Sequence, residues 1–507
     1  MQREMANSFA LSRTHLIYGL CIPLAVVIGY LLASGTESSS MAVVVFVLCV
    51  ICIPAMMRWH HPMLIFSCNA LICPYFLPGR PMMWMLLAVI SFFFAILDRS
   101  VGRNLEFFRA KWVSISLLFL GAVVLVTAWG HGGIGFRMLG STTFGGKKYF
   151  SLFAGMMLYF GMSVYPVKPG RVGLYSALFF LSALTALATF IAARGGPAFY
   201  FLVEMFPIEG AVQEALSSGP VFSGFQVARL NDLSWVANGL FCYMLARYGV
   251  RGVLDLAKPW RVLAFGAILA VGAWSGYRSI IIIFALSFLL MFWMEGLHRT
   301  RYMLVLLIGT LLVAGIALPN LRSLPPAIQR SLAFLPVNID PEVQLHADGS
   351  SEWRVEMWRE VLPQVPKHLL YGTGYGLNSD EYFMVSQDVL SGQAGSYETA
   401  AAAGDYHNGP LSLIMPFGLF GAAGFCWFLA ASIAVLRQNL RYGEPDMRNL
   451  NTFLLVYFIV RAIGFFLVFG SLHSDIVIFA SLIGLSVCLN GGVRQPPIAE
   501  AAEEVLE

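Results

Sequence analysis

Apolar stretches separated by short polar, glycine- or proline-containing turns follow one another along most of the chain. A helix of about 20 apolar residues crosses the hydrocarbon core of a bilayer. The stretches predict membrane-spanning helices at 15–33, 41–57, 63–78, 82–97, 113–129, 149–165, 172–193, 234–250, 260–275, 278–294, 302–318, 409–436, 451–470 and 474–490. The third and fourth are short and flank PGRP at 78–81, so they form either two spans or one broken, re-entrant pair. The pattern therefore predicts an all-α, polytopic integral membrane protein with about 12–14 transmembrane helices.

One long polar insertion interrupts this pattern and divides the chain into four parts. We expect transmembrane helices in 1–318, a partly helical loop domain in 319–408, the last three transmembrane helices in 409–490, and a disordered acidic tail in 491–507. Within the loop, Ser350 and Ser351 are expected to cap a first helix that ends at Pro363. A second short helix is expected at 379–389, after the glycine-rich sequence GTGYG.

Composition excludes several other classes of protein. The chain of 507 residues is 58% hydrophobic and 12% charged, whereas soluble domains are about 25% charged. A net charge of +4 is too small to indicate nucleic-acid binding. The eight cysteines lie in or beside apolar stretches, which predicts neither a disulfide framework nor a zinc site. The first apolar stretch is not followed by a small-residue cleavage site, so we expect it to be a retained helix.

Lysine and arginine are distributed unevenly between alternate loops. With a cytoplasmic N-terminus, most of the 32 lysines and arginines fall on the cytoplasmic side, as the positive-inside rule requires. This orientation makes the C-terminus cytoplasmic as well. It places the loops 130–148, 194–233 and 319–408 together on the outer face.

His407 is the first candidate for catalysis. It stands at the predicted boundary between membrane and water, at the start of a helix and beside Asp405. An imidazole titrates near pH ~6.5, which suits a general base. The helix N-terminus lowers its pKa and Asp405 raises it. The alternative interpretation is that His407 is only a helix cap or an interfacial residue.

The sequence around His407 resembles a known family. HNGPL at 407–411, followed by GLFG at 418–421, is similar to the His-Asn-x-x-Leu and Gly-x-x-Gly signature of the O-antigen ligase and O-antigen polymerase (Wzy-type) superfamily. Arg354, Trp358 and YGTGYG at 371–376 resemble its Arg, Trp and glycine-rich stretch, and WSGYRS at 274–279 resembles its Ser-Arg turn. The resemblance covers roughly 230–490. The chain departs from the pattern at Pro416, where relatives often have an acidic residue, and at the lengthened Ser-Arg turn.

The resemblance implies a GT-C-like glycosyltransferase of the bacterial inner membrane. Such an enzyme moves a glycan from an undecaprenyl-diphosphate donor to an acceptor glycan or lipid A-core at the periplasmic face. Transfer is inverting and uses neither a metal nor a cofactor. The implied partners are the lipid-linked glycan, the acceptor and the membrane lipids.

A diphosphate leaving group needs fixed cations, and arginine matches phosphate geometry. We expect Arg278, Arg354 and Arg194 to bind the diphosphate, although each arginine alone is also typical of an interfacial anchor. Arg461 lies inside a predicted span, where arginine is costly and usually paired or functional. Asp475 and His473 are its expected partners, and a substrate role and a structural ion pair both stay open.

Four further residues complete the set of candidates. Lys147 and Lys148 lie on the predicted outer face and are weaker cation candidates. Asn408 and Asp405 flank His407 and have either a substrate role or a structural one.

The sequence leaves the exact activity open. A ligase, a polymerase that extends a lipid-linked repeat, and an enzyme that glycosylates a protein share the donor chemistry. A transporter or flippase of lipid-linked glycans is the alternative from another class. It needs a basic cavity but no general base.

Overall fold

The computed structural model describes residues 38–74, 77, 80–101, 105–135, 143–195, 197–199, 202, 205–206, 229–390 and 397–496, together with Val26 and Gly29. The chain divides into two units, Met1–His60 and His61–Glu507. The packing and the candidate site described below lie in the second unit.

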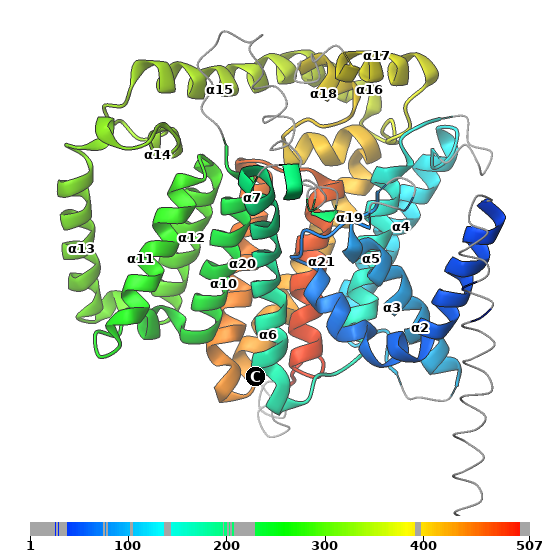
Figure 1. Ribbon diagram of the computed structural model, residues 1–507, viewed down its shortest axis with the longest axis horizontal. Coiled ribbons are helices and arrows are strands. Elements are labelled where there is room, and N and C mark those ends of the chain that lie inside the picture. The colour runs from blue at the N-terminus through cyan, green and yellow to red at the C-terminus, as the bar shows by residue number, and fades with distance from the viewer. Residues whose placement is uncertain are drawn as a thin grey trace, which may run out of the picture. The chain divides into compact units, whose positions relative to one another are not determined.

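Helices account for every named element in the described part of the chain (Figure 1). They are α2 (Ser38–Ser67), α3 (Met83–Ser100), α4 (Lys111–Gly130), α5 (Gly146–Ser163), η2 (Pro169–Arg171), α6 (Val172–Leu181), η3 (Ser182–Thr185), α7 (Ala186–Gly195), η4 (Pro197–Phe199), α10 (Asn231–Val253), α11 (Pro259–Trp274), α12 (Arg278–Met294), η5 (Leu297–Arg299), α13 (Tyr302–Ala317), η6 (Leu321–Ser323), α14 (Pro326–Leu332), α15 (Pro341–Val361), η7 (Leu362–Gln364), α16 (Val365–His368), α17 (Ser379–Leu390), α18 (Tyr397–Ala402), α19 (Gly409–Tyr442), η8 (Pro445–Met447), α20 (Arg448–Leu467) and α21 (Leu472–Leu489). Six helical segments among the described residues are long and apolar enough to cross a membrane, and α11, α12 and α13 are shorter apolar helices. The all-α, multi-pass membrane fold is thus confirmed.

The expected span at 63–78 is wrong. Helix α2 runs on to Ser67, and the chain then continues without helical structure to Met82 wherever it is described. Neighbouring segments satisfy its amides: Leu71 N–H donates to Thr185 Oγ1 at 3.0 Å, and Cys73 N–H donates to the Met205 carbonyl at 2.8 Å. Prolines in this stretch lack an amide hydrogen and interrupt a helix. The expected span at 15–33 lies outside the described residues apart from Val26 and Gly29.

Small residues let the helices of the second unit approach closely. A Cβ atom added to Gly155 on α5 would lie 2.8 Å from the side chain of Ile476 on α21. One added to Gly239 on α10 would lie 2.5 Å from the Ala183 side chain in η3. In a membrane, helices associate through such contacts because lipid is as apolar as the side chains. These contacts hold α5 against α21 and α10 against η3.

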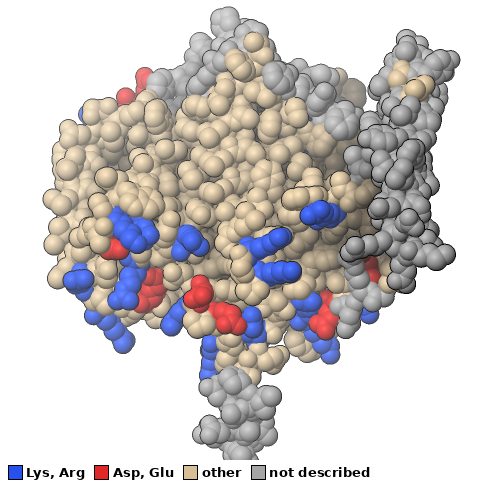
Figure 2. Space-filling view, turned by 60° about the horizontal axis from the view of Figure 1, so that its bottom comes forward, with Lys and Arg blue, Asp and Glu red and all other residues tan. Residues whose placement is uncertain are grey.

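The two ends of the bundle differ. Helices α15 to α18 lie across one end, here called the loop end (Figure 1). The opposite end, here called the basic end, carries the turns that join α10 to α11, α12 to α13 and α19 to α20. Figure 2 shows lysine and arginine side chains gathered around this end, beside a largely uncharged flank. Those turns and the helix ends beside them contribute Arg251, Lys258, Arg299, Arg301, Arg441 and Arg448.

Helix α19 is broken near the loop end. Pro416 lies inside it, and Gly418 has φ 61° and ψ −162°, outside the helical region. The 369–374 segment fills the break: Thr373 N–H donates to the Met415 carbonyl at 2.8 Å, and Gly374 N–H donates to the Pro416 carbonyl at 2.9 Å. Backbone groups at membrane depth must be satisfied within the protein. The glycine-rich sequence is therefore a structural partner of α19, and not only a turn.

Candidate active site

His407 occupies a strained turn that leads into α19. Its φ of 48° lies in the left-handed region, which is uncommon for residues other than glycine. Asn408 caps α19, because its Oδ1 accepts a hydrogen bond from Leu411 N–H at 3.0 Å. Trp358 Nε1–H donates to the Tyr406 carbonyl at 2.8 Å and so ties α15 to the same turn. The turn is thus fixed from both sides.

The His407 imidazole is packed between two aromatic rings. The Trp353 ring centroid lies 5.2 Å away, with the two ring planes at 66°, and the Phe469 ring centroid lies 5.0 Å away. Nδ1 of His407 is buried and has no hydrogen-bond partner among the described residues. An unpartnered buried ring nitrogen is unusual and calls for an explanation.

Burial lowers the pKa of His407 below its usual value. The positive charges of Arg354 and Arg229 lower this pKa as well, whereas the Asp405 carboxylate opposes them. Burial disfavours the charged form of an imidazole, and so do neighbouring cations. His407 is therefore neutral near pH 7, with one ring nitrogen able to accept a proton.

Three arginines, Arg229, Arg278 and Arg354, gather beside this imidazole and are called the arginine cluster here. Burial lowers the pKa of Arg354, and the charges of Arg278 and Arg229 lower it further. Arg229 also lies over the Tyr277 ring at 5.9 Å. Like charges held this close favour the binding of an anion, which relieves their repulsion.

Helix α15 positions two members of the cluster through neutral oxygens. Arg278 donates to the Ala347 carbonyl at 3.1 Å and to Ser351 Oγ at 3.3 Å. Arg229 donates to Ser350 Oγ at 3.3 Å. Neutral acceptors hold a guanidinium in place without cancelling its charge.

The prediction that Ser350 and Ser351 cap the first loop helix is wrong. Helix α15 begins earlier, at Pro341, and Asp340 is its N-cap: Asp340 Oδ1 accepts from Glu342 N–H at 2.9 Å. An aspartate followed by proline at the first helical position is a strong helix start. The two serines lie inside the helix, where their hydroxyl groups contact arginines. The second loop helix matches its prediction closely, as α17.

A comparison with protein families finds a match within the second unit. The family model described as O-Antigen ligase matches residues 263–426. This segment is similar to the O-antigen ligase family. The resemblance stated from the sequence is thus confirmed, over a shorter stretch than the expected 230–490. No curated protein matches the chain.

The O-antigen ligase segment contains His407 and two arginines of the cluster, Arg278 and Arg354. The family implies a membrane glycosyltransferase-like enzyme of polysaccharide biosynthesis. Arg229 lies outside the matched segment and was missed from the sequence. The sequence feature that could have identified Arg229 is its position just before the expected 234–250 span, on the same predicted face as Arg194.

Lys148 reaches the candidate site from α5. Its ammonium group donates to the Ala403 carbonyl and lies 5.5 Å from the centre of the Tyr375 ring. It also contributes to the electrostatic environment of His407. Lys147, its neighbour, is exposed. The structure thus brings Lys148 to the site more closely than Lys147.

Arg461 is connected to the same site through a buried polar chain. It donates to Asp475 Oδ1 at 3.0 Å, in an ion pair between α20 and α21. Asp475 Oδ2 accepts from Ser471 N–H at 2.9 Å, and Ser471 Oγ donates to Asp405 Oδ1 at 3.4 Å. Of the two expected partners of Arg461, Asp475 forms this pair, while Nδ1 of His473 lies 3.0 Å from Ser471 Oγ.

The other candidates are placed only in part. Arg194 lies in the last turn of α7, but its side chain is outside the described set. Its membership of the arginine cluster remains a prediction. The described residues contain no group of three or more His, Cys, Asp or Glu side chains that could hold a metal ion.

Proposed function

We propose that this chain is an O-antigen ligase-like glycosyltransferase of the bacterial inner membrane. It moves a glycan from an undecaprenyl-diphosphate donor to an acceptor sugar hydroxyl at the periplasmic face. The basic end faces the cytoplasm, with both termini, in keeping with the positive-inside rule. The loop domain 319–408 then covers the site from the periplasm, and the spans before it and the helices 409–490 after it form the membrane part.

The observation that carries this proposal is the buried, neutral imidazole of His407 beside the arginine cluster. A neutral base and a set of fixed cations are the two groups that transfer from a lipid diphosphate requires. The pKa of His407 is lowered by burial first, and the charges of Arg354 and Arg229 act in the same direction. The same cations that would bind the diphosphate thus add to the effect of burial, which keeps the base unprotonated.

The proposed reaction is a single inverting displacement. His407 takes the proton of the acceptor hydroxyl as its oxygen attacks the anomeric carbon of the donor sugar. The bond from that carbon to the diphosphate oxygen breaks, and the lipid diphosphate leaves with the electron pair. Arg278, Arg354, Arg229 and Arg194 stabilise the charge that develops on it. Because arginines supply this charge, the proposed reaction needs no metal ion.

The remaining candidates have supporting roles in this proposal. Asn408 fixes the start of α19 through its cap and so fixes the neighbouring His407. Asp405 orients the turn through Ser471 and limits how far the pKa of His407 falls. Lys148 holds the 403–405 backbone, and Lys147 adds positive charge at the rim. Arg461 stabilises the Asp475–Ser471 arrangement beneath Asp405.

A reconstituted transfer assay tests this function. Purified full-length protein in liposomes receives an undecaprenyl-diphosphate glycan and one of two acceptors, core lipid or a second lipid-linked repeat. We expect transfer to core lipid, and loss of it in His407→Ala by about 10²–10⁴-fold, the usual contribution of a general base. His368→Ala, at a histidine of α16 in the same loop domain, is the matched control.

Each contrary outcome has a definite meaning. Consumption of the lipid-linked repeat instead of core lipid identifies a polymerase. Full activity in His407→Ala contradicts the general-base mechanism. Movement of the lipid-linked glycan across the bilayer, without any transfer, identifies a transporter. Inhibition by a chelator that added divalent metal reverses contradicts metal independence.

A further inference from the structure

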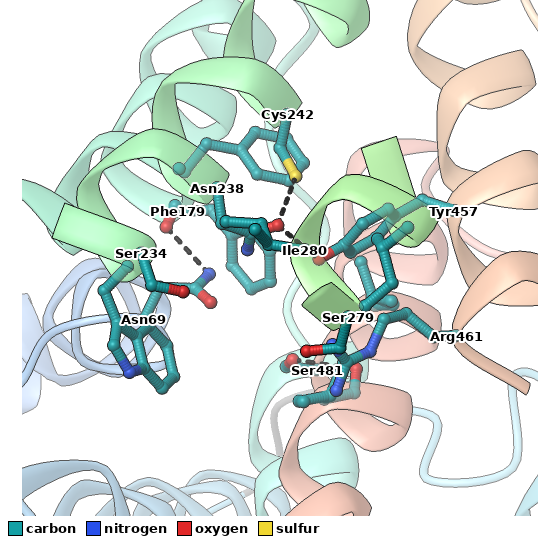
Figure 3. Close-up of a pocket in the computed structure, with 16 residues that line it drawn as sticks. Asn69, Phe179, Ser234, Asn238, Cys242, Ser279, Ile280, Tyr457, Arg461 and Ser481 are labelled. Atoms are coloured by element: carbon teal, nitrogen blue, oxygen red, sulfur yellow. Dashed lines mark hydrogen bonds between the residues drawn. The ribbon is translucent and has the colours of Figure 1, made fainter. Parts of the chain in front are cut away.

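A cavity lined by both apolar and polar side chains lies within the membrane-spanning helices of the second unit. It has a volume of about 160 Å³ and lies between α10, α12, α20 and α21 (Figure 3). Ser279 on its wall directly follows Arg278, so the cavity begins next to the arginine cluster. Polar groups at membrane depth are costly unless they serve a structure or a ligand, and the proposed chemistry does not use this cavity.

The polar lining comes from several elements that are distant in the sequence. Amide, hydroxyl and guanidinium groups converge there from Asn69, Ser234, Asn238, Ser279, Ser481 and Arg461. Asn69 belongs to the non-helical segment after α2. Irregular backbone at membrane depth is tolerated where it is buried in protein or lines a cavity. This segment thus adds to the evidence for a binding site.

Two of the amides are fixed in place before any ligand arrives. Asn69 Nδ2–H donates to the Phe179 carbonyl at 3.0 Å. Asn238 Oδ1 accepts from the Tyr457 hydroxyl at 3.1 Å. Each amide therefore uses one end for the protein, which leaves the acceptor of Asn69 and the donor of Asn238 for other partners. Such preorganised groups increase affinity because less freedom is lost on binding.

The charge of the cavity is balanced. Arg461 forms its ion pair with Asp475 at 3.0 Å, and its side chain is 21% exposed. A guanidinium has five N–H donors, so this pair leaves others for a ligand along the wall that Figure 3 shows. A cation that already forms an ion pair favours a neutral hydrogen-bonding ligand over a diphosphate.

Aromatic rings complete the lining, with Trp235 and Tyr457 among the residues of the wall. Aromatic surface combined with a few placed polar groups is typical of small-molecule sites. A pyranose ring matches this combination, because it has apolar C–H faces and hydroxyl groups around its edge. The volume limits the ligand: about 160 Å³ suits one sugar ring and not a longer glycan.

We propose that this cavity binds a single neutral sugar ring of the glycan substrate, next to the arginine cluster that binds the diphosphate. This inference rests on the proposed function and adds a sugar subsite to it. The ring belongs either to the donor, as the sugar linked to the diphosphate, or to the acceptor. The recognition chemistry is the same in both cases.

Binding measurements on the full-length protein in lipid nanodiscs test the subsite. The probes are bare undecaprenyl diphosphate and the same lipid with one pyranose sugar. The variants are Asn238→Leu, which keeps the volume and removes the amide, and the double variant Ser279→Ala/Ser481→Ala. Ser432→Ala is the matched control, because Ser432 is a buried serine of α19 that does not line the cavity.

We expect both cavity variants to raise the Kd of the glycosylated lipid by about 3- to 10-fold, as loss of one or two hydrogen bonds implies. The Kd of the bare lipid and the Ser432→Ala values stay unchanged. If the donor Kd is unaffected and the acceptor KM rises by a similar factor, the ring is that of the acceptor.

Two results overturn the inference. In the first, neither the Kd of the glycosylated lipid nor the KM of the acceptor changes in either cavity variant. In the second, the cavity variants lose as much affinity for the bare lipid diphosphate as for the glycosylated lipid. Failure of the proposed function has a different signature, because the wild-type protein then neither binds the bare lipid diphosphate nor transfers glycan.

Discussion

His407 combines an unfavourable backbone conformation with a fixed, buried side chain. A residue in a sparsely populated conformation costs of order 1–3 kcal/mol and persists only where its surroundings impose it. Here the Asn408 cap and the Trp358 hydrogen bond impose it. The imidazole is held between Trp353 and Phe469, within the electrostatic influence of Arg354 and Arg229.

The charge of Arg354 should be visible in the pH dependence of transfer. His407 acts as a base only when neutral, so the acid limb of the rate profile follows its lowered pKa. Arg354→Gln removes a cation that lowers this pKa, so the pKa rises and the acid limb moves to higher pH. Rate profiles between pH 4 and 8 measure the shift. Arg359→Gln, at an exposed arginine of the same helix, is the control. If the acid limb does not move in Arg354→Gln, the charge of Arg354 does not lower the pKa of His407.

The backbone strain predicts a ranking of substitutions at position 407. Both His407→Asn and His407→Val remove the imidazole and should abolish transfer. Asparagine tolerates the left-handed region and β-branched residues do not, so His407→Asn should be more stable by about 1–3 kcal/mol. Thermal unfolding in detergent gives the order. Equal stability of the two variants would show that the turn relaxes.

At the scale of elements, the break in α19 and the 369–374 segment form one unit. A Cβ atom at Gly372, which has φ +67°, would lie 2.3 Å from the Pro416 backbone. One at Gly418 would lie 2.2 Å from the Leu370 carbonyl oxygen. Backbone meets backbone at both points, so no side-chain movement can make room.

Gly372→Ala should therefore lower both the unfolding temperature and the transfer rate. The expected loss of stability is of order 1–3 kcal/mol from the left-handed backbone alone. Gly349→Ala, in α15 with open space around it, is the matched control and should gain about 0.5–1 kcal/mol. Wild-type stability in Gly372→Ala would mean that the segment is not docked in the break.

Sequence patterns predicted the helices better than the connections between them. Apolar stretches of sufficient length define spans such as α4 and α20, because lipid requires them. The segment after Ser67 is apolar but does not form a spanning helix. Its amides instead donate hydrogen bonds to Thr185 and Met205, which are distant in the sequence. Local spacing contains no information about such partners.

The same limit applies to the candidate site. His407 and Arg354 could be identified from a local motif. Arg229 belongs to the arginine cluster, and the serines of α15 accept hydrogen bonds from arginines, only because tertiary contacts bring α15 over the ends of α10 and α12. No local pattern encodes these contacts.

At the scale of the whole molecule, charge and apolar surface define how the second unit sits in a membrane. The basic turns lie at one end and α15 to α18 at the other (Figures 1 and 2). Helix α13 has no buried residue, which suits a helix surrounded by lipid. These features favour one orientation, with the loop end outside the cytoplasm.

Cysteine labelling in intact cells tests that orientation. Lys367→Cys lies exposed at the loop end and Asp446→Cys lies exposed at the basic end. A membrane-impermeant maleimide should label Lys367→Cys directly and Asp446→Cys only after permeabilisation, with the wild-type cysteines as background. The reverse pattern would place His407 in the cytoplasm and contradict the proposed function.

The docked glycine segment also has a consequence for how the chain is made. It leaves the ribosome before α19 and therefore lacks its partner until that helix has been inserted. In the proposed orientation the segment is then exported, and a nascent chain that stops before residue 409 should be a substrate for periplasmic quality control. Helix α19, inserted without the segment, would present unpaired peptide groups to lipid. We therefore expect the yield of folded protein to depend on how soon α19 follows the 369–374 segment into place.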